Sequence, residues 1–95
     1  MNISVSTNSI KIDRNIKSVS DFQKIKSNLD SLTIQHKSII INITDSMSIT
    51  SSVIGYFNKL ILKDKIKIQI EVGNDQLFEL LNELNLVSVF NAKKV

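Results

Sequence analysis

A strand, a helix and a strand in succession constrain the fold of this chain more than any other feature. Residues 38–43 contain three consecutive isoleucines, and residues 66–72 alternate strictly between apolar and polar side chains. Between these segments, apolar residues recur at the three- and four-residue spacing of a helix: Val53, Ile54, Phe57, Leu60 and Ile61. This succession predicts a parallel pair of strands joined by a right-handed crossover.

The two strands of this unit differ in pattern and therefore in their expected surroundings. The unbroken β-branched run in residues 38–43 is typical of a strand covered on both faces, so we expect it at the centre of a sheet. The alternation in residues 66–72 is typical of a strand with one buried face and one wet face. Helices are therefore predicted to cover mainly one face of the sheet.

The segment before this unit predicts a hairpin and a helix. Residues 2–6 and 10–13 alternate in polarity and are separated by a polar turn, which is the pattern of a β-hairpin. Ser20 and Gln23 then fit a capping box at the start of a helix. Apolar residues follow along one helical face: Val19, Phe22, Ile25, Leu29 and Leu32.

The segment after the unit predicts a third helix. Residues 73–75 supply a turn and an N-cap, and a leucine stripe follows: Leu77, Leu80, Leu81 and Leu84. Asn85 is expected to end this helix, because asparagine tolerates the left-handed conformation there. The last residues, 87–95, are expected to add a short turn or an edge strand. The sequence therefore predicts one small α/β domain over residues 1–95, in β-β-α-β-α-β-α order, with a mixed sheet.

Composition limits the functional classes that such a domain can serve. The 95 residues contain no cysteine, which excludes disulfides and thiolate metal sites. No segment approaches the roughly 20 apolar residues of a membrane-spanning helix, so we expect a cytoplasmic protein without direct membrane insertion. The net charge of +3 comes from scattered lysines, with Arg14 as the sole arginine, a composition that disfavours nucleic-acid binding.

A short motif gives the domain a resemblance to a known family. Residues 49–55 read Ile-Thr-Ser-Ser-Val-Ile-Gly, which resembles the Ile-Asp-Ser-Ser-Gly-Leu-Gly that opens a helix in STAS domains, the anti-sigma factor antagonist domains. The strand, turn and leucine-rich helix of residues 66–86 are similar to that family as well. Thr50 and Val53 stand where the family has Asp and Gly, and Asn42 stands where the central strand often has Asp. By element order, the resemblance extends over almost the whole chain.

The resemblance implies a regulatory binding module that works without catalysis. In the family, a partner kinase phosphorylates the first serine of the motif, which corresponds to Ser51 here. The implied partner is a histidine-kinase-like ATPase or anti-sigma factor. The implied binding surface surrounds the motif: Met47, Ile49, Thr50, Ser51, Ser52, Val53 and Gly55. The alternative is a STAS subunit that stabilises a larger assembly, such as a transporter ATPase complex, without phosphorylation.

The chemistry of these residues is compatible with a role in partner binding, but each residue also has a simpler structural interpretation. A phosphate on Ser51 would lie beside the free N–H groups in the first turn of a helix. Ordinary N-capping by residues 50–52 is the simpler interpretation of the same polar stretch. Gly55 costs about 1 kcal/mol inside a helix, which either close packing on the sheet or contact with a partner would explain. Met47 is either an exposed, adaptable contact or a core residue.

The sequence predicts neither an enzyme nor a cofactor or metal site. His36 has no second histidine or cysteine with which to share a metal, so it is expected on a surface loop. The acids Asp13, Asp45 and Asp64 are dispersed, and no two of them are spaced for general acid–base work. Gly73 is isolated, which excludes a glycine-rich phosphate loop.

Overall fold

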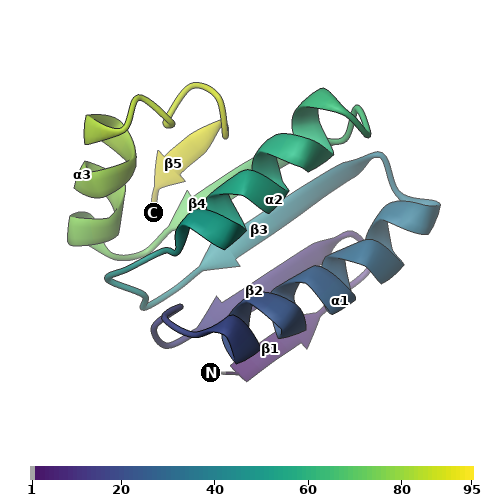
Figure 1. The fold of residues 1–95 in the computed structure, drawn as a ribbon, viewed down its shortest axis with the longest axis horizontal. Coiled ribbons are helices and arrows are strands. Elements are labelled where there is room, and N and C mark those ends of the chain that lie inside the picture. Colours follow the sequence, from purple (N-terminus) through teal and green to yellow (C-terminus); the bar gives the residue numbers. More distant parts are fainter. Residues whose placement is uncertain (1) are drawn as a thin grey trace.

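The computed structural model describes residues 2–95, which form a five-stranded sheet and three helices (Figure 1). In chain order the elements are β1 (Asn2–Val5), β2 (Ser9–Asp13), α1 (Val19–Gln35), β3 (Ser38–Ile43), α2 (Ser51–Leu62), β4 (Lys67–Val72), α3 (Asp75–Glu83) and β5 (Ala92–Lys94). The predicted α/β class and element order are confirmed. The end of the chain adds an edge strand, β5, which was one of the two forms expected there.

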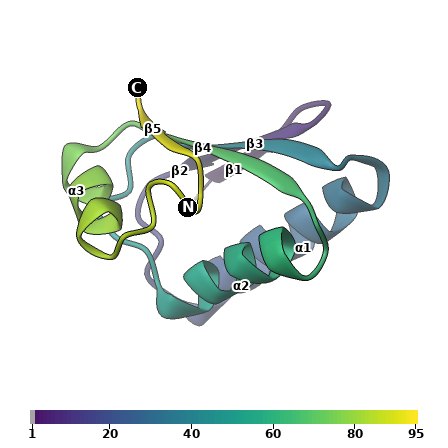
Figure 2. The same ribbon diagram turned by 90° about the horizontal axis from the view of Figure 1, so that it is seen from above.

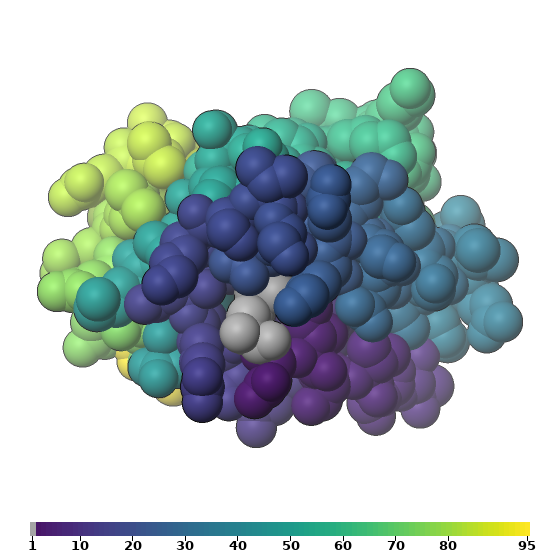
Figure 3. Space-filling view, turned by 60° about the horizontal axis from the view of Figure 1, so that its bottom comes forward, coloured from purple at the N-terminus to yellow at the C-terminus, as the bar shows by residue number. Residues whose placement is uncertain are grey.

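The sheet is mixed, and its strands follow one another in sequence order from β1 to β5. β1 and β2 form the antiparallel hairpin, whereas β2, β3, β4 and β5 run parallel (Figure 2). In Figure 3 the hairpin of β1 and β2 is seen as the purple residues, with β1 in the darkest purple. β3 is central and pairs with β4 along its whole length, from Ser38 opposite Lys67 to Ile43 opposite Val72. The predicted parallel β-α-β unit is therefore confirmed.

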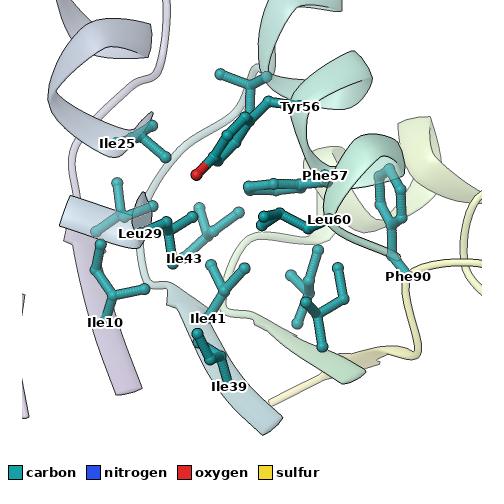
Figure 4. Close-up of a cluster of buried hydrophobic side chains, with 14 of the residues drawn as sticks. Ile10, Ile25, Leu29, Ile39, Ile41, Ile43, Tyr56, Phe57, Leu60 and Phe90 are labelled. Atoms are coloured by element: carbon teal, nitrogen blue, oxygen red, sulfur yellow. The ribbon is translucent and has the colours of Figure 1, made fainter. Parts of the chain in front are cut away.

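The core lies between the sheet and the helices, which all lie on one side of it (Figure 2). The residues of β2, β3 and β4 that face the helices are 6% exposed or less: Ile10, Ile12, Ile39, Ile41, Ile43, Ile68, Ile70 and Val72. Phe57 of α2 lies over them and meets Phe90 edge to face, with 5.7 Å between ring centroids (Figure 4). Each fully buried side chain of this kind stabilises the fold by about 1.5–3 kcal/mol.

The other face of the sheet is open, which corrects the expectation that β3 is covered on both faces. Ile39 and Ile41 are buried, but Ile40 between them points to the open face and is only half-buried. No helix among residues 2–95 covers that face, and side chains alternate along a strand, so one isoleucine of the run remains at the surface. Residues of the open face form a polar row in register across the five strands: Ser4, Lys11, Asn42, Glu71 and Lys93.

α1 begins two residues earlier than the sequence pattern predicts. Ser18 is the N-cap, and its hydroxyl accepts a hydrogen bond from the Asp21 N–H at 3.0 Å. The Asp21 carboxylate accepts from the N–H groups of Lys17 and Ser18, and these bonds, led by that of Lys17, hold its pKa below the ordinary value. The predicted Ser20–Gln23 box is therefore wrong, because an aspartate at the third helical position closes the box equally well. Val19, the first residue of the helix, is 73% exposed and not part of the core.

α3 begins and ends as the sequence predicts. The Asn74 side chain accepts a hydrogen bond from the Leu77 N–H at 3.1 Å, so Asn74 is the N-cap. Asn85 follows the last turn with a φ of 59°, in the left-handed conformation. At Gly73, an added Cβ would collide with the backbone carbonyl of Thr44, so this turn requires glycine.

Candidate functional site

The loop that leads into α2 is held in place by hydrogen bonds to the loop that leads into α1. Ser46 is fully buried; its hydroxyl accepts from the Ile16 N–H at 3.0 Å and donates to the Ser48 carbonyl at 2.6 Å. The Ser48 hydroxyl in turn donates to the Ile16 carbonyl at 2.8 Å. Asn15 accepts a hydrogen bond from the Met47 N–H, also at 2.8 Å. These bonds fix the start of α2 relative to the sheet.

The N-cap of α2 is Thr50, as the position of the motif suggests. Its hydroxyl accepts a hydrogen bond from the Val53 N–H at 3.3 Å, in extended backbone geometry. Ser51 and Ser52 form the first helical turn, and both are exposed. Their hydroxyls have no hydrogen-bond partner among residues 2–95, and their backbone N–H groups precede the first intrahelical bond. Capping therefore occupies Thr50 and leaves the two serines free.

Gly55 lies one turn later on the outer side of α2. It is exposed, and a Cβ built onto it would meet no atom within 4 Å. Close packing on the sheet is therefore the wrong interpretation of this glycine. Because glycine weakens a helix by about 1 kcal/mol relative to alanine, the fold of the chain gives no reason for it.

Two of the seven residues expected at the binding surface do not belong there. Val53 is fully buried, because its place in the helical stripe turns it toward the sheet. Ile49 is half-buried and packs against the core. Met47, by contrast, is 53% exposed, so the interpretation of Met47 as a core residue is wrong. We use "α2 N-terminal surface" for the exposed set, with half-buried Thr50 at its border: Met47, Ser51, Ser52 and Gly55.

The inner side of α2 is fixed to α1 by a polar contact at the edge of the core. The Tyr56 hydroxyl donates to an Asp30 carboxylate oxygen at 2.5 Å, and the Lys26 ammonium lies 2.8 Å from the other oxygen. Burial, together with the bond to Asp30, raises the pKa of Tyr56 above its ordinary value. Burial alone would raise the pKa of Asp30, but the hydrogen bonds from Lys26 and Tyr56 hold it below the ordinary value. This contact sets the orientation of the helix that carries the surface.

A hollow of about 340 Å³ lies beside the same two loops. Both signs of charge line it: Arg14, Asn15, Lys17, Asp21 and Asp45. Two of these groups are already used by the fold, since Asn15 bonds the Met47 backbone and Asp21 caps α1. The hollow therefore lies beside the loops that hold the start of α2 in place.

Other expected site residues lie apart from this surface. His36 is half-buried and follows the last residue of α1 as its C-cap, in the loop position expected for it. Asn42 lies on the open face, where its amide donates to Glu71 at 3.1 Å and its Oδ1 has no partner among the described residues.

Within residues 2–95, no three or more His, Cys, Asp or Glu side chains gather as a metal site would require. None of the helices described has both the length and the apolar character needed to cross a bilayer.

Comparison with known proteins supports the fold. No family model matches the chain, and no curated protein matches it significantly. Among solved structures, the NMR structure of the protein TM1081 is similar, with a TM-score of 0.67 at 13% sequence identity. The likeness covers 98% of this chain and 79% of that one. At this level of identity the likeness shows the fold alone.

Proposed function

We propose that this chain is a STAS-type regulatory module that binds a protein partner through the α2 N-terminal surface. The observation that carries the proposal is an exposed Ser51 followed one turn later by an exposed Gly55 that nothing in the chain packs against. A surface glycine of this kind weakens the helix, and close approach of a partner's surface accounts for it. Met47, in the loop before α2, is 53% exposed and offers a flexible apolar contact that can adapt to a partner.

Phosphorylation of Ser51 is the proposed switch at this surface. A phosphate there would add about −1.5 to −2 charges next to the unbonded N–H groups of the first turn. The first turn of α2 contains no acidic side chain that would repel it. Thr50 is unsuited to the same role, because its hydroxyl already bonds the Val53 N–H. The modified surface would be strongly anionic and would release a partner that fits the neutral form.

The partner that this proposal requires is a protein with its own nucleotide site. A histidine-kinase-like ATPase or anti-sigma factor would supply ATP, and this chain would be its ligand and substrate. The chain itself then needs no catalytic group, metal or cofactor. Under this proposal, the module would act in the cytoplasm, in a partner-switching system of transcription regulation.

The proposal is tested by isolating the partner and measuring its affinity for two variants. Ser51→Ala should bind like the parent, and Ser51→Asp should bind several-fold more weakly, since a carboxylate carries less charge than phosphate. Titration calorimetry measures both, and far-UV circular dichroism verifies that each variant is folded. Incubation with the partner kinase and ATP, followed by phosphopeptide mapping, should place the label on Ser51.

An exposed serine on α1 provides the matched control. Ser31 lies outside the α2 N-terminal surface, so Ser31→Asp adds the same charge elsewhere and should bind like the parent. If both Ser51 variants bind like the parent, or if the label lies elsewhere, the switch is refuted. A partner that proves to be a transporter ATPase would instead favour a constitutive STAS subunit.

A further inference from the structure

The two edges of the sheet differ in how they are protected against pairing with another strand. β5 is three residues long and carries Lys93 and Lys94, and lysine is a common protection of sheet edges. β1 reads Asn-Ile-Ser-Val and contains no charge, proline or glycine. In Figure 3 its purple residues lie at the surface next to the blue residues of α1. β1 is therefore an edge strand of four residues that has its short length as protection but no charge, proline or glycine.

The register of the hairpin identifies the backbone groups that β1 leaves unpaired. The Ser6 N–H donates to the Ser9 carbonyl at 2.9 Å, in line with the register of the whole hairpin. Hydrogen-bonded pairs alternate along an antiparallel ladder, so the next residue of β1 that bonds β2 is Ser4. The N–H and C=O groups of Ile3 and Val5 therefore point away from β2 and toward the open edge.

We propose that two copies of this chain associate through β1, antiparallel and about a two-fold axis. Ile3 of one copy would lie opposite Val5 of the other, and each of these pairs would exchange two N–H···O=C bonds. Ser4 would face its own counterpart on the axis, as a pair without hydrogen bonds. A second copy fits this edge because an antiparallel strand is complementary to itself and β1 brings no like charges together.

The dimer would keep the α2 N-terminal surface free in both copies. α1 lies over β1 and β2, whereas α2 lies farther along the sheet, over β3 and β4 (Figure 1). Pairing through β1 joins the two sheets edge to edge and adds nothing over α2. The dimer would thus present two binding surfaces, whatever partner occupies them.

A cysteine on the proposed axis tests the arrangement directly. The chain has no cysteine of its own, so Ser4→Cys introduces a single reactive thiol. In a pair without hydrogen bonds the two Cα atoms lie about 4.5 Å apart, within the range that a disulfide spans. Mild oxidation of Ser4→Cys should yield a disulfide-linked dimer, while Lys93→Cys on the exposed part of β5 should remain mostly without a cross-link. Equal cross-linking of the two variants would overturn the proposal.

A charge on the axis tests the same arrangement without covalent chemistry. Ser4→Glu lies beside Lys11 within one copy, which favours the monomer, but places two carboxylates opposite each other in the dimer. Sedimentation equilibrium of the parent at submillimolar concentration should give twice the chain mass of 10.7 kDa. Ser4→Glu should weaken association at least tenfold. Mixing Ser4→Glu with Ser4→Lys should restore association, because opposite charges then face each other. Ser88→Glu, an exposed control, should associate like the parent. A parent that stays monomeric, or a Ser4→Glu variant that associates like it, would refute pairing through β1.

Discussion

The two sides of α2, one helix of twelve residues, differ in whether packing within the fold explains their residues. On the inner side, Val53, Phe57 and Leu60 are fully buried, and each is explained by the core that it fills. On the outer side, Ser51 and Gly55 are exposed; within residues 2–95 the Ser51 hydroxyl has no hydrogen-bond partner and nothing packs against Gly55. The inner side is therefore accounted for by folding, and the outer side is where a function beyond folding is to be sought.

The largest expected effect comes from removing the main side chain of the inner side. Phe57→Ala would leave a cavity under α2 and remove the edge-to-face contact with Phe90, at a cost of about 3–5 kcal/mol. Leu62→Ala, at a 66% exposed position of the same helix, should change stability by less than about 0.5 kcal/mol. Urea unfolding of both variants measures the difference. Similar losses in the two variants would remove the distinction between the two sides.

The second effect concerns the polar contact at the border between the two sides. Tyr56→Phe removes the hydrogen bond to Asp30 and should cost about 1 kcal/mol, because Asp30 retains Lys26 and is partly exposed to water. The pKa of Tyr56 is raised in the folded chain, so its contribution is complete below the ordinary pKa of 10.0 and is lost as the pH rises above it. The parent should therefore lose stability more steeply above pH 10.0 than Tyr56→Phe does. Parallel slopes in chemical unfolding across this range would show that the hydroxyl does not contribute in this way.

Most of the fold can be predicted from the sequence because each strand and helix carries its own periodic pattern. The alternation in β4 and the spacing of Val53, Phe57 and Leu60 each identify one buried face. The run of isoleucines in β3 misled the prediction, because an apolar side chain such as Ile40 can lie on an open face without disrupting the strand. The start of α1 was misplaced because Ser18 and Ser20 offer nearly equivalent capping patterns.

The candidate site was predictable only in part. The motif located Ser51 and Gly55, and the capping role of Thr50 followed from helix chemistry. Motif position could not distinguish exposed from buried side chains, so Val53 was included in the surface although it faces the core. The bonds that fix the loop join residues about thirty positions apart, as between Ser46 and Ile16, and no local pattern reveals such contacts.

The smallest expected effect distinguishes the two sides most sharply, because stability and binding should change in opposite directions. Gly55→Ala adds a methyl group where no atom lies within 4 Å, so it should stabilise α2 by about 0.5–1 kcal/mol. Gly73→Ala is the matched control, since its methyl group collides with the Thr44 carbonyl and should destabilise the fold. If Gly55 is where a partner approaches closely, the alanine that strengthens the helix should weaken partner binding several-fold, while Ser31→Ala on the exposed side of α1 leaves it unchanged. Thermal unfolding and titration calorimetry on the same preparations measure both quantities. A stabilised Gly55→Ala variant that binds its partner as tightly as the parent would mean that the glycine serves no contact, and the binding surface would have to be sought away from the outer side of α2.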